Sequence, residues 1–378
     1  MFWQGRYTVK GRSEQFREVI EGSARVLVST GAITKRMEAF YNPIMEFNRS
    51  VTILFLNSVP QERLIVGLPM AATGVRGIRI LKEVKKRVMV HFNDKSEIAT
   101  KIIKRNLKLN KLSAGFTVSN LDASIFMLGS KGFSYLDIDP FGTPSPFLDS
   151  AVRRVSRQGY LGVTATDTAP LAGTYPKACL RNYWAMPVRN EFMHETGLRI
   201  LIRKVQLIAS QFDKALEPVF SYYRDHYYRV FFRARKSKSA ADGLLKQHGW
   251  LAGCRRCLRR YHSITPAPSK CECGAKLNYA GPLWLGKLWD TSFVERMLKH
   301  ADSNTKQFLS TIYEESKVNA IGFYTLGMIG KVLKLSELPK KHKLIEKLNK
   351  AGYKASPTHF SPEGVAIRGN PQLKPLLL

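Results

Sequence analysis

Residues 63–94 read RLIVGLPMAATGVRGIRILKEVKKRVMVHFND. The stretch opens on a short apolar run at Leu64–Val66, passes a turn around Gly74, continues with helical spacing, and ends on a second apolar run at Val88–Phe92. A buried strand, a glycine turn, a helix and another buried strand make up one unit of a parallel α/β sheet. The stretch therefore predicts an α/β fold.

Apolar runs farther along the chain extend this alternation. Strands are predicted at Phe116–Val118, Phe133–Ile138 and Tyr160–Ala165, and a long helix at Glu191–Ser210. Acidic residues follow several of these runs, and ligands of open α/β sheets bind at the carboxyl ends of the strands. The pattern indicates a Rossmann-like domain with its site at that edge of the sheet.

The composition points to a polyanionic partner. Of 378 residues, 60 are Lys or Arg and 29 are Asp or Glu, which gives a net charge of +31. Nucleic acid is the first candidate for such a charge and an anionic membrane surface the second. No run approaches the ~18–20 apolar residues of a membrane span, the start of the chain lacks the apolar region of a secretory signal, and five cysteines are too few for a disulfide scaffold. We expect a soluble cytoplasmic protein.

The charge is concentrated after the predicted sheet. The segment Arg224–Lys276 holds thirteen Lys or Arg residues, three acids and four of the five cysteines. We therefore expect a catalytic domain over residues 1–235 and a C-terminal α+β domain over 236–378, with a cysteine-rich knuckle at about 250–279.

The glycine turn and the acid after the second strand suggest a nucleoside site. Gly74 and Asp94 are twenty residues apart, as in folds where a strand-end acid accepts ribose hydroxyls about 20 residues after the turn. The full G-x-G-x-x-G fingerprint of dinucleotide sites is absent, so S-adenosylmethionine fits better than NAD or FAD. The alternative is an ordinary turn with a solvated acid.

The motif Asp137-Ile138-Asp139-Pro140-Phe141-Gly142 ends the fourth predicted strand. A carboxylate and a Pro carbonyl can accept hydrogen bonds from an exocyclic base amine, whose lone pair is otherwise conjugated with the ring. An aromatic side chain can stack on the extruded base. The motif thus predicts methyl transfer to a nucleobase amine. The alternative is a strand ending in a proline turn, with Phe141 in the core.

Four cysteines in two close pairs, Cys254, Cys257, Cys271 and Cys273, have the spacing of a structural zinc site. Two disulfides or four unconnected thiols are the alternatives. The basic residues around the first pair, Arg255, Arg256, Arg259 and Arg260, suggest that the knuckle presents positive charge to a phosphate backbone. Cys179 is distant in sequence from the other four cysteines, and we interpret it as a buried apolar residue and not as a nucleophile.

These features resemble the tRNA (guanine-26-N2)-dimethyltransferase family, in its zinc-containing branch. The resemblance rests on seven motifs, at residues 40–43 with Asn48-Arg49, 72–79, 137–144, 164–167, 176–179, 281–286 and 358–361. It implies a class I methyltransferase domain and a C-terminal tRNA-binding domain. It also implies transfer of one or two methyl groups from S-adenosylmethionine to N2 of a tRNA guanine, with guanine 26 as the expected target.

The resemblance also implies roles for individual residues. The methyl donor would be held by Arg49, Arg76, Asp94, Asp122 and Ala123, the catalytic motif would be Asp139, Pro140 and Phe141, and zinc would be held by Cys254, Cys257, Cys271 and Cys273. tRNA is the expected partner, with no membrane and no protein partner evident. The alternatives are N2-methylation of a different or neighbouring tRNA guanine, a non-catalytic RNA-binding protein on the same fold, and, most remotely, a hydride-transfer enzyme.

Overall fold

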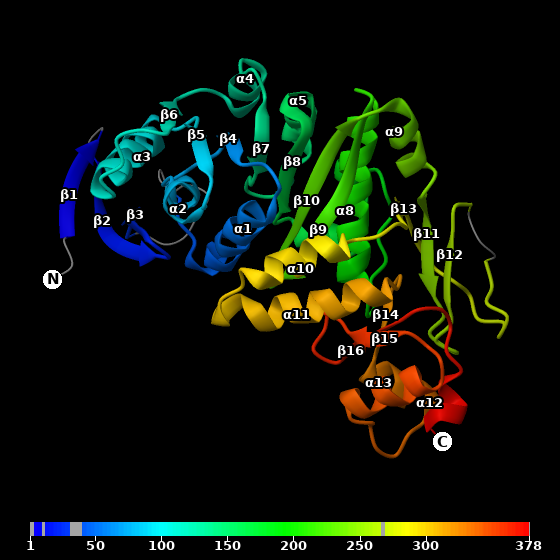
Figure 1. Ribbon diagram of the computed structural model, residues 1–378. Coiled ribbons are helices and arrows are strands. Elements are labelled where there is room, and N and C mark those ends of the chain that lie inside the picture. Colours follow the sequence, from blue (N-terminus) through cyan, green and yellow to red (C-terminus); the bar gives the residue numbers. More distant parts are fainter. Residues whose placement is uncertain (1–3, 10–11, 31–39, 266–268, 378) are drawn as a thin grey trace. The chain divides into compact units, whose positions relative to one another are not determined.

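The computed structural model describes residues 4–9, 12–30, 40–265 and 269–377 (Figure 1). The chain forms two compact units, residues 1–163 and 164–378. Compact units need not coincide with functional domains, so the boundary near residue 235 stays a prediction. Across these described ranges, no helix combines the length and apolarity needed to cross a bilayer.

The first unit is built on parallel strands. They are β4 (Arg63–Leu68), β5 (Arg87–Asn93), β6 (Phe116–Ser119), β7 (Phe133–Ile138) and β8 (Val155–Ala165). The order of these strands in the sheet is β6-β5-β4-β7-β8. Chain order reverses between β4 and β7, the switch point where open α/β sheets bind ligands. The predicted Rossmann-like fold is confirmed.

Among the described residues, one α-helix precedes β4 and four connect the strands from β4 to β8. They are α1 (Glu46–Ser58), α2 (Val75–Glu83), α3 (Glu97–Leu109), α4 (Ala123–Leu128) and α5 (Leu148–Arg154), with short 3-10 turns at Pro43–Met45 and Ser145–Phe147. Ser96 caps α3, because its side chain accepts a hydrogen bond from the Ala99 amide at 3.2 Å. Ile102 and Ile103 are buried on the apolar face of this helix.

An antiparallel sheet precedes these elements and was not predicted. It consists of β1 (Gln4–Val9), β2 (Arg12–Glu21) and β3 (Ala24–Ser29), in that order. Strand β3 packs against α2 and α3, and the Leu27 amide donates to Asn106 Oδ1 of α3 at 2.7 Å. The sheet thereby places β2 against the helices of the first unit.

The second unit starts with helices and a long hairpin. Its first elements are α6 (Thr168–Leu171), α7 (Pro176–Tyr183), α8 (Met193–Ser210), β9 (Lys214–Arg224), β10 (Tyr227–Lys236) and α9 (Lys238–Leu245). The helix predicted at Glu191–Ser210 is confirmed as α8. Strands β9 and β10 pair in antiparallel fashion, because the chain reverses at Asp225, whose φ is +52°.

The remainder of this unit carries two small sheets. The strands β11 (His248–Gly253), β12 (Arg260–Ser263) and β13 (Tyr279–Trp284) pair in the order β12-β11-β13. The strands β14 (Phe323–Thr325), β15 (Ala355–Pro357) and β16 (Gly364–Ile367) pair in the order β14-β16-β15. Helices α10 (Thr291–Lys299), α11 (Ser303–Val318), α12 (Leu326–Leu333), α13 (Lys341–Lys350) and α14 (Leu373–Leu377) complete the predicted α+β part.

Candidate functional site

The strand-end acid Asp94 organises the predicted nucleoside loop. Its Oδ2 accepts from the Ala72 amide and its Oδ1 from the Ser96 amide, both at 2.9 Å. Gly74, with φ +80°, precedes α2 in a conformation that glycine adopts without strain. Burial raises the pKa of Asp94, while the two backbone amides and Lys95 oppose that rise. Each carboxylate oxygen has a second lone pair, so Asp94 can still accept ribose hydroxyls.

The third strand brings Asp122 and Ala123 to the same edge of the sheet. Asp122 caps α4, accepting from the amides of Ser124 at 2.8 Å and Ile125 at 3.3 Å. Its side chain lies on the surface and Ala123 is buried behind it. Both residues follow β6, the strand beside β5, so they lie on the same side of the switch point as Asp94.

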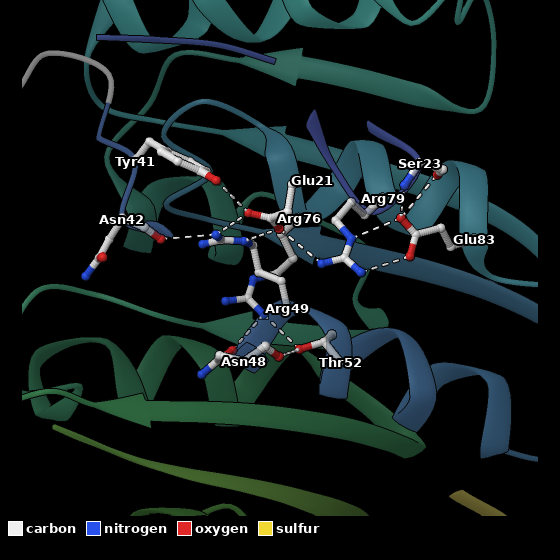
Figure 2. Close-up of polar contacts among 10 residues, drawn as sticks. All are labelled: Glu21, Ser23, Tyr41, Asn42, Asn48, Arg49, Thr52, Arg76, Arg79 and Glu83. Atoms are coloured by element: carbon white, nitrogen blue, oxygen red, sulfur yellow. Dashed lines mark hydrogen bonds and ion pairs between the residues drawn. The ribbon is translucent and has the colours of Figure 1, made fainter. Parts of the chain in front are cut away.

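Arg76 connects α1 and α2 to the catalytic motif. Its Nη1 donates to Asn48 Oδ1 at 3.0 Å and Thr52 Oγ1 at 2.8 Å (Figure 2). Its Nη2 donates to Asp139 Oδ2, and Nη1 lies 3.7 Å from Asp137 Oδ2. One guanidinium thus faces both acids of the motif.

Asp139, Pro140 and Phe141 follow β7 directly. The Asp139 side chain is 22% exposed, whereas that of Asp137 is 1% exposed and accepts from the Tyr135 hydroxyl. Phe141 is 45% exposed and forms a T-shaped contact with Phe40, with ring centroids 4.2 Å apart. The alternative that placed Phe141 in the core is wrong, since its ring is open to a stacking partner.

Arg49 lies in a buried ionic cluster (Figure 2). It donates to both carboxylate oxygens of Glu21, to one of them from Nε at 2.6 Å, and to the Asn42 carbonyl at 3.1 Å. Glu21 is 1% exposed and also accepts from Arg79 and from the Tyr41 hydroxyl, each at 3.0 Å. Burial raises the pKa of Glu21, but Arg49 and Arg79 together lower it below its ordinary value.

The four cysteines come together in the second unit. Their Sγ atoms all lie within 4.8 Å of one another, with Cys254 3.5 Å from Cys273 and Cys257 3.4 Å from Cys271. A tetrahedral zinc with Zn–S bonds of ~2.3 Å requires sulfur separations of roughly 3.8 Å. Four soft thiolate donors at these separations fit zinc, and none of the four ligand positions is left for a substrate.

The basic residues around the first cysteine pair differ in their surroundings. Arg255 and Arg256 are exposed, but Arg260 is buried and ion-pairs with Glu191 at 2.9 Å. It also donates to the Phe323 carbonyl. The expectation that Arg260 meets a phosphate backbone is therefore wrong, because its charge is already neutralised inside the protein. Arg259 is ion-paired with Glu272.

The profile of the N2,N2-dimethylguanosine tRNA methyltransferase family matches residues 17–376. The chain belongs to this family. Its similarity to individual members extends over nearly their full length. It is 39% identical to the tRNA (guanine(26)-N(2)/guanine(27)-N(2))-dimethyltransferase of Aquifex aeolicus over 338 residues, or 85% of this chain and 86% of that protein. It is also 39% identical to the tRNA (guanine(26)-N(2))-dimethyltransferase of Archaeoglobus fulgidus over 344 residues, or 91% and 93% of the two chains.

A solved structure of this family has the same fold. Trm1 from Pyrococcus horikoshii, in complex with S-adenosyl-L-methionine, superposes with a TM-score of 0.81 at 34% identity. The alignment covers 93% of this chain and 96% of that one. The family resemblance deduced from the motifs is therefore confirmed, as is the class of fold.

Two buried groups that contact the predicted donor-binding residues or the loops beside them were missed by the sequence reasoning. Asn93 is buried and binds both neighbouring loops, donating to the carbonyls of Pro69 and Leu121 at 2.9 Å. The sequence signal that could have identified Asn93 was its position directly before Asp94, at the end of the second predicted strand. Glu21 was missed because it lies in an N-terminal sheet with no chemical motif.

Proposed function

We propose that this protein is an S-adenosylmethionine-dependent tRNA methyltransferase that acts on N2 of guanine 26 and forms N2-methyl- and N2,N2-dimethylguanosine. The observation that carries this proposal is the Asp139-Pro140-Phe141 turn. It places a partly exposed carboxylate and an exposed ring at the carboxyl end of β7, beside the switch point, in a chain of the dimethyltransferase family.

The loops after β4, β5 and β6 suit the methyl donor. Asp94 is the acceptor for the ribose hydroxyls, and Asp122 and Ala123 border the same edge of the sheet. Arg49 and Arg76 are assigned to the donor by the family resemblance, and each guanidinium is also ion-paired within the protein, Arg49 with Glu21 and Arg76 with Asp139. When bound, S-adenosylmethionine supplies an electrophilic methyl group on a sulfonium. These five assignments remain predictions.

Asp139 and Pro140 act on the guanine amine. The free N2 amine is planar and conjugated, so its lone pair is not available to attack. Acceptance of one N2–H by the Asp139 carboxylate and of the other by the Pro140 carbonyl favours a pyramidal nitrogen with its lone pair directed at the methyl group. The carboxylate also stabilises the positive charge that develops on the nitrogen. The exposed ring of Phe141 stacks on the flipped base.

Arg76 is a positioning residue for this carboxylate. Its Nη2 donates to Asp139 Oδ2, and its other nitrogen is held by Asn48 and Thr52. The structure joins Asp139 Oδ1 to no hydrogen-bond donor among the described residues. Asp139 thus presents one oriented oxygen to the base amine.

A second candidate is methylation of guanine 27 in addition to guanine 26. The Aquifex aeolicus relative carries both positions in its name. The same active-site chemistry serves both guanines, because they differ only in their place in the tRNA. The choice would be made by how the tRNA is held.

One experiment separates these possibilities. The protein is incubated with labelled S-adenosylmethionine and three unmodified tRNA transcripts: one native, one with guanine 26 replaced by adenine, and one with guanine 27 replaced. Label lost only with the first replacement supports guanine 26 alone, and partial loss with each supports both. Tight tRNA binding without transfer to any transcript would contradict the proposal and favour a non-catalytic RNA-binding protein.

A further inference from the structure

A cavity of about 540 Å³ lies beside the cysteine cluster of the second unit. Three segments line it: residues 187–190, Gly253 with Arg255 and Arg256, and residues 275–279 apart from Leu277. This volume is in the range of cavities that hold small ligands, ~300–1,000 Å³. None of the predicted donor-binding or catalytic residues lines it.

The lining is strongly positive. It includes Arg189, Arg255, Arg256 and Lys276, all exposed, and no acidic residue. Arg255 donates to the Arg189 carbonyl at 2.9 Å and Arg256 to the Cys273 carbonyl at 3.1 Å. Carbonyls are neutral, and within the described part of the chain none of these four cations is ion-paired with a carboxylate. Their charges therefore remain available to an anion.

The cysteine cluster holds two of the three walls. Arg255 and Arg256 lie between Cys254 and Cys257, so the first metal-binding loop carries both guanidiniums. The wall at 275–279 starts two residues after Cys273, and the Cys271 amide donates to the Ala275 carbonyl at 2.8 Å. A metal bound by both cysteine pairs would fix these two walls against each other.

We propose that this cavity is a phosphate-binding subsite for the sugar–phosphate backbone of the tRNA, and that the four-cysteine metal site maintains its shape. The proposal rests on the proposed function and specifies where the second unit holds the substrate. The chemistry of the lining selects for an anion that only accepts hydrogen bonds. Guanidinium and ammonium groups donate without accepting, and the amides of Asn190 and Asn278 add further donors. Phosphodiester oxygens are such acceptors.

The test compares two double variants with equal charge loss. Arg189→Ala with Lys276→Ala removes two cavity cations whose side chains hold no structural hydrogen bond in the described part of the chain. Lys343→Ala with Lys350→Ala removes two exposed cations of α13, in the same unit but outside the cavity. The affinity for unmodified tRNA transcript is measured over a range of salt concentrations, and the affinity for S-adenosylmethionine by calorimetry.

We expect the cavity variant to bind tRNA about tenfold more weakly. The slope of log affinity against log salt should fall by about 1.4–1.8, since each of the two lost phosphate contacts lowers it by about 0.7–0.9. The α13 variant should keep most of the wild-type tRNA affinity and most of the wild-type slope. S-adenosylmethionine affinity, zinc content and melting temperature should be unchanged in both variants. Wild-type tRNA affinity in the cavity variant, or equal losses in the two variants, would overturn the subsite.

Metal removal tests the second half of the proposal. The chelated protein should bind tRNA no better than the cavity variant and still bind S-adenosylmethionine as the wild type does. Full tRNA affinity without metal would overturn the supporting role of the cysteine cluster. Failure of the proposed function is a separate result: tRNA binding that depends on the cavity cations, without methyl transfer to guanine, would preserve the subsite and reject the enzyme.

Discussion

Arg76 Nη2 donates a hydrogen bond to Asp139 Oδ2, across 63 residues of sequence. The Nη1 atom of the same guanidinium donates hydrogen bonds to Asn48 and Thr52 of α1 and also lies near the Asp137 carboxylate. The orientation of the proposed catalytic carboxylate thus depends on helix α1, which itself carries no catalytic group.

Replacement of Asp139 by Ala should lower the single-turnover rate of methyl transfer by ~10²-fold or more, the usual scale for one positioned acid–base group. The reason is the loss of the acceptor that pyramidalises the guanine amine. Affinity for donor and tRNA should change far less. Asp149→Ala, an exposed acid on α5, is the matched control. A near-normal rate in Asp139→Ala would refute the mechanism.

Phe141→Ala should weaken the productive complex with tRNA by about 5- to 150-fold, because stacking of a base on an aromatic ring contributes about 1–3 kcal/mol. The ring is 45% exposed, so its removal leaves no large core cavity. Single-turnover rates against tRNA concentration measure the effect. Phe141→Tyr retains the stacking face and should stay close to wild type; equal losses in both variants would argue against stacking.

Asp94→Ala should weaken S-adenosylmethionine binding by about one to two decades, the ~1.5–3 kcal/mol of a charge-assisted hydrogen bond. Calorimetric titration gives the dissociation constant directly. Glu97→Ala, three residues later and exposed, controls for a general effect of lost charge on this loop. An unchanged dissociation constant in Asp94→Ala would mean that the donor site is elsewhere.

Glu21→Gln should destabilise the first unit by about 3 kcal/mol or more, because removal of one charge from a buried ion pair leaves its partners uncompensated. Its partners Arg49 and Arg79 are themselves nearly buried. Glu18→Gln is the control on the same strand; its partner Arg25 is largely exposed, so the loss should be below about 1 kcal/mol. Denaturant unfolding followed by circular dichroism measures both. Similar losses in the two variants would show that the Glu21 cluster contributes little.

The pH dependence of this effect has a definite sign. The pKa of Glu21 in the folded protein lies below its ordinary value of 4.5, so the ionised carboxylate stabilises the fold fully above pH 4.5. That stabilisation is lost as the pH falls from 4.5 through the folded pKa. The stability difference between wild type and Glu21→Gln should therefore be constant from pH 6 to 8 and shrink below pH 4.5. A difference that grows in acid would contradict this assignment.

Elemental analysis should find about one zinc per chain, as a single four-thiolate site requires. The knuckle has a small core, with Ala252 and Leu277 among its few apolar residues. Metal removal should therefore unfold this region and lower the melting temperature, since structural sites draw folding free energy from the metal. Cys179→Ser, which alters the isolated buried cysteine, should leave the zinc content unchanged. An identical melting curve without metal would exclude a structural role.

Much of the architecture could be predicted because it is local in sequence. The strands β4, β5 and β7 are apolar runs, Ser96 caps a helix that starts beside it, and the two cysteine pairs are close enough in the chain for their spacing to indicate a metal site. The strand-end acids were predictable as well, because parallel strands place their carboxyl ends at one edge of the sheet.

Only the tertiary structure decided which charges pair with which. Glu21 meets Arg49 across 28 residues and Arg76 meets Asp139 across 63, while Arg260 is buried and Arg255 close by is exposed. Short-range periodicity reports which face of an element is apolar, but it carries no information on which distant element packs there. From the sequence alone, one Arg in a basic run cannot be distinguished from the next. In the folded protein they differ, because burial removes water from one guanidinium and a carboxylate distant in sequence replaces that water.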